Sequence, residues 1–147
     1  MPRADNVKIL LVEDDDGHAR LIERGLRKVG LTNPIDRVAD GQEALDYLFR
    51  TGRYSGSTDP LPTLMLLDIN LPRVDGIEVL ERVKGDTRLR AITIFMLTST
   101  DTQAEIDRCY RAGANGYVAK PISISELGEK LKRLGLFLEI VELPQIA

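Results

Sequence analysis

The sequence is poor in cysteine, histidine and aromatic residues, and these shortages exclude several kinds of site. Among its 147 residues there is one cysteine, Cys109, so no internal disulfide can form, which fits a reducing cytosol. The one histidine, His18, has no second histidine with which to build a metal site, and we expect it to be an exposed helix residue. Cys109 has no histidine partner to activate it as a nucleophile, so we expect it to pack on a helix.

Long apolar runs and a strong net charge are also missing. No apolar run approaches the roughly 20 residues needed to span a bilayer, and residues 1–5 lack the apolar core of a signal peptide. The formal net charge is −3, and no basic stripe with interleaved aromatic residues occurs. Such a sequence argues against nucleic-acid binding. We therefore expect a cytoplasmic protein that binds neither nucleic acid nor membrane.

What remains is the composition of an ordinary globular domain, with 43% hydrophobic and 29% charged residues. A chain of this length can bury a substantial core. No linker, internal repeat or low-complexity tract divides it. We predict one domain over residues 1–147, with its core at about 7–135 and a C-terminal extension at 136–147.

Apolar runs of strand length alternate with segments of helical periodicity. The predicted strands are Val7–Val12, Pro34–Ala39, Leu64–Asp68, Ala91–Leu97 and Gly116–Ala119. The predicted helices are His18–Val29 (ended by Gly30), one around Ala44–Leu48, Gly76–Lys84, Gln103–Ala112, and one from Ser123 or Ser125 toward Leu136. The stretch Thr51–Pro62, rich in small and turn-forming residues, predicts an exposed loop. This alternation predicts a three-layer α/β sandwich with five parallel strands and right-handed crossovers.

Acids, a hydroxyl and a lysine stand at four of the predicted strand ends. Glu13 and Asp14 follow the first strand, Asp68 ends the third, Thr98 follows the fourth and Lys120 follows the fifth. The carboxyl ends of parallel strands meet at one edge of a sheet, where ligands bind. Carboxylates drawn together there repel one another unless a hard cation such as Mg²⁺ binds. Lys120 would add a positive charge, and Thr98 a hydroxyl donor, for a phosphoryl oxygen.

Each of these residues also has a structural explanation when it is taken alone. Acids after a strand are often solvated loop residues or helix caps, and we expect that of Asp15 and Asp16. Asp40 and Asp75 each precede a glycine and are expected to be turn formers, and Asp75-Gly76 also predicts a helix start. The joint placement at four strand ends is what favours a site.

Four motifs in this order resemble the receiver domain of bacterial response regulators. They are Leu11-Val12-Glu13-Asp14-Asp15, Leu66-Leu67-Asp68-Ile69-Asn70-Leu71-Pro72 with Asp75-Gly76, Leu97-Thr98-Ser99, and Gly116-Tyr117-Val118-Ala119-Lys120-Pro121. The resemblance covers about Lys8 to Leu134 and implies a flavodoxin-like (βα)5 fold with its parallel sheet in the order 2-1-3-4-5. The loop Thr51–Pro62 and the tail through Leu143-Pro144 further resemble the single-domain regulators of bacterial phytochrome-type histidine kinases.

The resemblance implies a role for each residue of the site. Asp68 would be the phosphoacceptor, and Lys120 would pair with Asp68 or with its phosphate. Asp14 and Asp68 would bind Mg²⁺ directly, Glu13 would bind it through water, and the backbone carbonyl of Asn70 would be a further ligand. Glu13 stands where aspartate is more frequent in the family, which leaves a water-mediated role open to its longer side chain.

The resemblance also implies a switch and a control of phosphate lifetime. Thr98 and Tyr117 would form the switch pair. Asn70 and Thr100, each two residues past a site residue, would influence how long the phosphate survives. The Lys120–Pro121 peptide would be cis.

We therefore expect a phosphoacceptor signalling domain, not an enzyme, that takes its phosphoryl group from a sensor histidine kinase, a bacteriophytochrome being one candidate. Since the sequence ends soon after the last predicted helix, we expect the output to be protein contact. That contact would be a homodimer through the C-terminal half, a downstream partner, or the removal of phosphate from the kinase. The apolar tail 136–147 would either pack on its own domain or form a subunit contact.

Three alternatives are open. Haloacid-dehalogenase-like phosphatases also use an aspartate nucleophile with Mg²⁺ and lysine, but they need a second aspartate where Asn70 stands. A flavin- or nucleotide-binding protein is disfavoured, because the first turn, residues 13–17, is acidic instead of glycine-rich and would repel an anion. A receiver domain could also serve only as a docking module.

Overall fold

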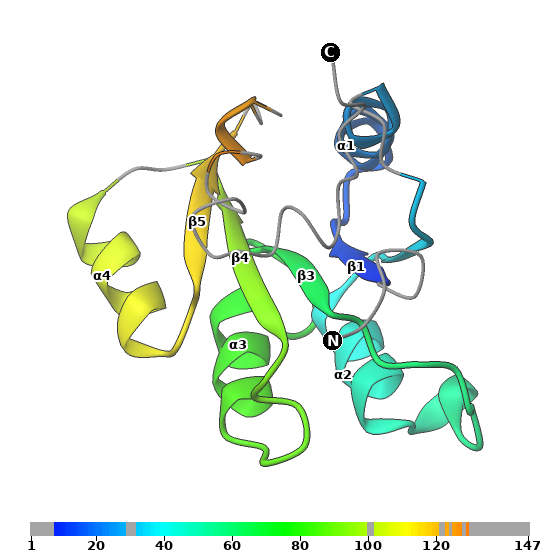
Figure 1. Cartoon of the computed structure of the whole chain (residues 1–147). Helices are drawn as coiled ribbons and strands as arrows, with labels where there is room; N and C mark the ends of the chain where they lie inside the picture. The colour runs from blue at the N-terminus through cyan, green and yellow to red at the C-terminus, as the bar shows by residue number, and fades with distance from the viewer. Residues whose placement is uncertain are drawn as a thin grey trace.

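A five-stranded parallel sheet forms the middle layer of the chain, and its strands run in the order β2-β1-β3-β4-β5 (Figure 1). The computed structural model describes residues 8–28, 32–99, 102–120, 123, 125–127 and 129. The strands are β1 (Ile9–Val12), β2 (Ile35–Val38), β3 (Leu64–Asp68), β4 (Thr93–Thr98) and β5 (Gly116–Ala119). The predicted flavodoxin-like fold and its 2-1-3-4-5 strand order are confirmed.

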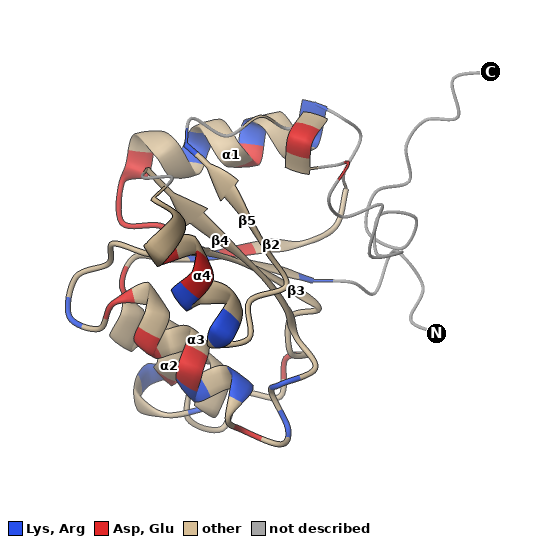
Figure 2. Cartoon of the chain, turned by 90° about the vertical axis from the view of Figure 1, so that its left-hand side faces the viewer, with Lys and Arg blue, Asp and Glu red and all other residues tan. Residues whose placement is uncertain are grey.

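Helices cover both faces of the sheet. They are α1 (Asp16–Lys28), α2 (Gly41–Phe49), α3 (Gly76–Lys84) and α4 (Gln103–Arg111), with a short 3-10 turn, η2 (Gly52–Tyr54). Figure 2 shows α1 on one side of the sheet and α2, α3 and α4 on the other. Residues 125–127 and 129 are also helical, and the Ser123 hydroxyl accepts the Glu126 N–H at 3.1 Å as a cap.

The side chains of the strands alternate between two hydrophobic cores. The core on the side of α1, here the α1-side core, contains Ile9, Leu11, Ile22, Leu66, Phe95, Val118 and Leu127 among others. The core on the other side contains Leu10, Val12, Met65, Leu67, Val79, Met96 and Cys109 among others. β1 and β3 are buried on both faces, which is why their sequences read as unbroken apolar runs.

Several element boundaries differ from the predictions by one or two residues, and the contacts explain the starts of α1 and β4. α1 begins at Asp16, two residues before the predicted start, because the Asp15 side chain accepts the His18 N–H at 2.8 Å and caps a polar first turn. β4 begins at Thr93, where its N–H bonds to the carbonyl of Thr63. The two residues before it, predicted as strand, close a turn in which the Ile92 N–H bonds back to Leu89.

The predicted exposed loop has side chains that pack inward, among them Tyr54. The ring of Tyr54 meets that of Tyr47 edge to face at 5.1 Å between centroids, and its hydroxyl donates to Glu43 at 3.1 Å. Tyr47 in turn donates to Asp36 of β2 at 2.7 Å. These contacts attach the middle of the loop to α2.

Three smaller expectations can also be compared with the structure. Cys109 is buried on α4 and His18 is exposed on α1, as predicted. In the part of the chain that the structure describes, no helix is long and apolar enough to cross a bilayer. The predictions for Gly30, for the Lys120–Pro121 peptide and for residues 136–147 concern positions outside the described residues.

Candidate functional site

Asp68 ends β3 and is almost fully buried, with 5% of its side chain exposed. One oxygen, Oδ1, accepts the Asn70 N–H at 3.2 Å, and Oδ2 lies 2.8 Å from Lys120 Nζ. The backbone turns sharply after this strand, because the Gly76 N–H bonds back to the Ile69 carbonyl at 2.8 Å. A Cβ on Gly76 would lie 2.1 Å from the Asp68 carbonyl oxygen, so only glycine fits beside the acid.

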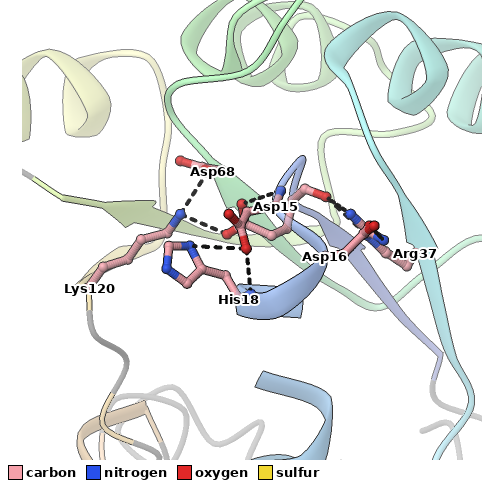
Figure 3. Close-up of polar contacts among 7 residues, drawn as sticks. Asp15, Asp16, His18, Arg37, Asp68 and Lys120 are labelled. Atoms are coloured by element: carbon pink, nitrogen blue, oxygen red, sulfur yellow. Dashed lines mark hydrogen bonds and ion pairs between the residues drawn. The ribbon is translucent and has the colours of Figure 1, made fainter. Parts of the chain in front are cut away.

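Glu13 follows β1 and is completely buried. Its Oε1 lies 2.7 Å from Lys120 Nζ, the one partner that the described residues provide for that oxygen. Its Oε2 accepts the Asp15 N–H at 3.2 Å. Glu13, Asp68 and Lys120 therefore meet at one point although they are far apart in sequence. Figure 3 shows the Lys120 side chain pointing toward Asp68.

The alternation of the strands explains why these three side chains meet. Each comes two residues after a strand residue that packs in the α1-side core; those residues are Leu11, Leu66 and Val118. Since strand side chains repeat every second residue, all three charged groups emerge on the α1 side at the carboxyl edge of the sheet. The sequence thus sets both the edge and the face of the site.

Lys120 is the cation that joins the two buried acids. Burial acts to lower the pKa of Lys120, but its hydrogen bonds to Asp68 and Glu13 outweigh burial and raise the pKa above the usual lysine value. The ammonium group is therefore charged at neutral pH. Its backbone N–H also bonds to the Thr98 carbonyl at 2.7 Å, which fixes the lysine against the end of β4.

Asp14 completes an acidic cluster with Glu13 and Asp68. One carboxylate oxygen from each lies within 4.8 Å of the others, and Asp14 is exposed to solvent. Three carboxylates carry three negative charges and Lys120 one positive charge, so the group has an excess of two. Oxygen ligands with this excess fit a divalent hard cation such as Mg²⁺, with the exposed side left for water and substrate.

The three consecutive aspartates after Glu13 have different surroundings. Asp14 makes no hydrogen bond or ion pair with the described residues, and Asp15 caps α1. The His18 N–H is the largest influence on the pKa of Asp15, which is lowered. Asp16 is paired with Arg37 of β2, with Nη1 and Oδ1 separated by 2.5 Å. Asp15 and Asp16 were expected to be solvated loop residues or helix caps; Asp15 is a cap, and Asp16 is exposed but ion-paired.

Arg37 is the neighbour of the site that the sequence analysis missed. Its Nε and Nη2 groups both donate to the Glu13 backbone carbonyl, at 3.0 and 2.7 Å. The one signal in the sequence was a pair of charged residues inside a short strand, Asp36 and Arg37. That signal does not say which element the side chains contact.

Thr98 ends β4, and Tyr117 lies on the neighbouring strand β5. Thr98 is buried, with 1% exposure, and Tyr117 is half-buried on β5. Tyr117 is in register with Met96, two residues before Thr98 on β4, so both side chains occupy the same face. The Tyr117 ring meets Tyr110 of α4 edge to face at 6.1 Å between centroids. The structure brings the two residues to one face and leaves the switch untested.

Asn70 and Thr100 were predicted to control phosphate lifetime. Asn70 is exposed, two residues past Asp68, with its N–H on the Asp68 carboxylate. Thr100 lies outside the described residues. Neither role is tested by these contacts.

The model of the response regulator receiver domain family matches residues 9–132 of the chain. The chain is 40% identical over 126 residues to a protein named Probable methanogenesis regulatory protein FilR2, from Methanothrix harundinacea, covering 86% of this chain and 79% of that protein. The solved structure of the bacteriophytochrome response regulator AtBRR superposes with a TM-score of 0.81 at 41% identity, covering 89% of this chain and 94% of that one.

Two further solved structures are similar over nearly their whole length. The Mn²⁺-bound form of response regulator Rcp1 has a TM-score of 0.75 at 30% identity, covering 96% of this chain and 97% of that one. The phosphorylated cyanobacterial phytochrome response regulator RcpA has a TM-score of 0.76 at 34% identity, covering 95% of this chain and 99% of that one. One of these relatives thus carries a divalent metal ion and the other a phosphoryl group.

Proposed function

The chain belongs to the response regulator receiver domain family, and on that premise we propose that it accepts a phosphoryl group on Asp68 from a sensor histidine kinase. Receiver domains are signalling domains of two-component systems and are generally not enzymes. The observation that carries the proposal is the buried Asp68 carboxylate, which lies against Lys120 and beside two further acids. The matched region is also the basis for proposing one receiver domain with its core at about 7–135.

The transfer asks little acid–base chemistry of the protein. The phosphorus–nitrogen bond to a kinase histidine breaks as a phosphorus–oxygen bond forms to an Asp68 oxygen, and the electron pair of the broken bond stays on the imidazole nitrogen. Since the transition state is loose, positioning and charge neutralisation dominate. Lys120 Nζ, 2.8 Å from Asp68 Oδ2, is placed to neutralise phosphoryl oxygens.

We propose that Asp14 and Asp68 would hold Mg²⁺ directly, with Glu13 acting through water and the Asn70 carbonyl as a further ligand. When bound, the ion would supply positive charge for the phosphoryl oxygens. The excess of two negative charges in the cluster and the Mn²⁺-bound relative support this assignment. Glu13 supports the indirect role, because both of its oxygens already have partners, Lys120 and the Asp15 N–H.

We propose that the Thr98 hydroxyl responds to the phosphoryl group and that Tyr117 then turns into the space that Thr98 leaves. Phosphorylation adds roughly −1.5 to −2 charges, which attract a hydroxyl donor. The shared face of the two residues supports this pairing. Asn70, together with Thr100, would flank the attacking water and set the lifetime of the phosphate.

A phytochrome-type histidine kinase is the partner that we propose, since AtBRR and RcpA are regulators of phytochromes by name. We propose protein contact as the output, with homodimerisation through the C-terminal half as one form of it. Tyr110 of α4, with 46% exposure beside Tyr117, supports a contact on that face. Sedimentation at tens of micromolar that gives only monomer, with and without a phosphate mimic, would count against the dimer.

Phosphorylation by a small phosphodonor tests the function directly. Acetyl phosphate or phosphoramidate with Mg²⁺ should add one phosphoryl group, seen as an intact-mass increase that is lost when Mg²⁺ is chelated. Asp68→Asn should abolish the increase. Asp75→Asn is the matched control, because Asp75 is an exposed helix cap of the same chemical type, and it should label normally. Equal labelling of Asp68→Asn would reject the assignment.

A further inference from the structure

At the end of the β1–β2 pairing, the backbone carbonyl of Glu13 accepts its hydrogen bonds from a side chain and not from the backbone of the neighbouring strand. The Glu13 N–H completes the ladder by bonding to the Val38 carbonyl at 3.1 Å. In this parallel register the next N–H that would face the Glu13 carbonyl is that of Asp40, which belongs to the cap of α2. The Glu13 carbonyl receives two hydrogen bonds from a side chain, that of Arg37.

Arg37 makes three contacts with the acidic turn from one planar group. Nε and Nη2 donate to the Glu13 carbonyl at 3.0 and 2.7 Å, and Nη1 donates to Asp16 Oδ1 at 2.5 Å. The side chain is 25% exposed, so these bonds are partly shielded from water. A guanidinium presents its donors in a rigid fork, and a lysine ammonium cannot reproduce this arrangement. Figure 3 shows Arg37 and Lys120 on opposite sides of the acidic turn.

These contacts hold the turn where two of the proposed Mg²⁺ ligands begin. Glu13 is fixed at its backbone by β2 and at its side chain by Lys120, while Asp16 is fixed by Arg37. Asp14, between them, stays without a partner among the described residues and faces solvent. Of the consecutive acids, Asp14 is the one that remains available to the cation.

We propose that Arg37 is a positioning residue of the cation site, which holds the acidic turn so that Asp14 and Glu13 meet Asp68 in the geometry that a divalent cation needs. This inference depends on the proposed function for the identity of the cation. Arg37 contacts neither the cation position nor Asp68, and it acts through the Glu13 carbonyl and Asp16.

Charge and position make opposite predictions for substitutions at Arg37. If Arg37 acted only by its charge, Arg37→Gln would make the cluster more negative and tighten Mg²⁺ binding, while Arg37→Lys would bind as the unaltered protein does. If Arg37 positions the turn, both substitutions weaken binding. Loss of an outer-shell partner typically reduces metal affinity by about tenfold or more, and we expect about tenfold for Arg37→Gln.

The test is a calorimetric titration of the full chain with Mg²⁺ for the unaltered protein, Arg37→Gln, Arg37→Lys and Arg88→Gln. Arg88 is the matched control, since it also donates to a backbone carbonyl, that of Leu48, and its loss changes the net charge equally. Thermal unfolding without metal, and hydrogen exchange at the Asp15 amide, report separately on folding and on the turn. In Arg37→Gln we expect weaker Mg²⁺ binding and faster exchange at the Asp15 amide. In Arg88→Gln we expect Mg²⁺ affinity and exchange at that amide to be unchanged.

The outcomes separate this inference from the proposed function. Phosphorylation of Arg37→Gln should need about tenfold more Mg²⁺ but approach the normal rate at saturation. Unchanged or tighter Mg²⁺ binding in Arg37→Gln, with Mg²⁺ binding intact in the unaltered protein, would overturn the role of Arg37. If the unaltered protein neither bound Mg²⁺ nor accepted phosphate, the proposed function itself would fail.

Discussion

Replacing Lys120 by methionine tests whether the buried carboxylates of Glu13 and Asp68 repel each other when the lysine charge is removed. Methionine keeps most of the apolar stem and removes the cation that lies 2.7 Å from Glu13 and 2.8 Å from Asp68. The variant then holds two buried carboxylates with no cation between them, and among the described residues each keeps only one backbone N–H as a donor. We expect Lys120→Met to be destabilised in the absence of Mg²⁺, although no apolar packing is lost.

The size of the effect follows from two limits. At an effective dielectric constant of about 20, each contact with Lys120 is worth roughly 6 kcal/mol before the cost of removing the ions from water, which is several kcal/mol for each ion. The variant can also take up a proton on one carboxyl, which costs about 1.4 kcal/mol for each pH unit above an ordinary carboxyl pKa near 4. The second limit caps the part of the destabilisation that comes from repulsion between the carboxylates, at about 4 kcal/mol at pH 7 and about 1 kcal/mol at pH 5.

The pH dependence has a definite sign. The folded variant binds a proton that its unfolded chain does not, so its stability falls as the pH rises and the destabilisation grows from pH 5 to pH 8. Mg²⁺ should restore part of the loss, because a cation that binds only the folded state stabilises it by about 1.4 kcal/mol at tenfold excess over its dissociation constant. Urea unfolding at several pH values, with and without Mg²⁺, measures both effects.

Lys84→Met is the control for removing a half-buried lysine. Lys84 Nζ donates to the carbonyls of Arg90 and Ile92 and to the Asn115 side chain, at 3.1, 2.6 and 3.1 Å, and none of these three acceptors is a carboxylate. Its loss should cost about 1 to 3 kcal/mol by leaving acceptors unpaired, equally at pH 5 and pH 8. The reasoning is refuted if Lys120→Met is destabilised by the same amount at both pH values and does not respond to Mg²⁺.

Two further predictions concern the surroundings of the site and the far end of the sheet. Gly76→Ala should lower the free energy of unfolding by about 3 kcal/mol or more, because its Cβ would lie 2.1 Å from the Asp68 carbonyl oxygen. Gly85→Ala is the control and should lower it clearly less, because the nearest atom to its Cβ is a carbonyl oxygen at 3.1 Å. Equal losses for the two variants in urea unfolding would contradict the clash. Burial acts to raise the pKa of Asp36, but hydrogen bonds from Tyr47 and Lys8 outweigh this effect. The pKa of Asp36 therefore lies below the ordinary aspartate value of 3.8. The charged form therefore stabilises the fold above that pH, so Asp36→Asn should cost about 1 kcal/mol at pH 7 for a partly exposed hydrogen bond. The difference should disappear as the pH falls below about 3.8, and a difference that is constant down to pH 3 would show another cause.

The parts of the fold that could be predicted are those fixed by local alternation. Unbroken apolar runs identify β1 and β3, since strands buried on both faces need no polar residue. The acids at their ends predict the site because parallel strands share one carboxyl edge. Asp75 before Gly76 predicts the start of α3, and the structure shows the Asp75 side chain accepting the Glu78 N–H. The strand order came from the resemblance to a family, since periodicity does not fix which strands are neighbours.

The parts that could not be predicted depend on contacts between distant segments. Arg37 reads as a charged residue in a weak strand, and only the pairing of β1 with β2 shows that its guanidinium reaches the Glu13 carbonyl. The polar loop predicted exposure for Tyr54, and its ring is packed because α2 presents Tyr47 and Glu43 to it. Composition describes the average environment of a segment and not the partner of a single side chain.

The charged residues of β2 have a consequence for self-association. β2 is an edge strand of the sheet. It is four residues long, and two of the four are Asp36 and Arg37. An edge strand with unpaired backbone groups can pair with a strand of another chain. Native proteins prevent this with short edge strands and charged side chains. Here both charges are bound inward, Asp36 to Tyr47 and Arg37 to the acidic turn. The Arg37 guanidinium that orders the acidic turn thus also helps to prevent a sixth strand from adding to this edge of the sheet.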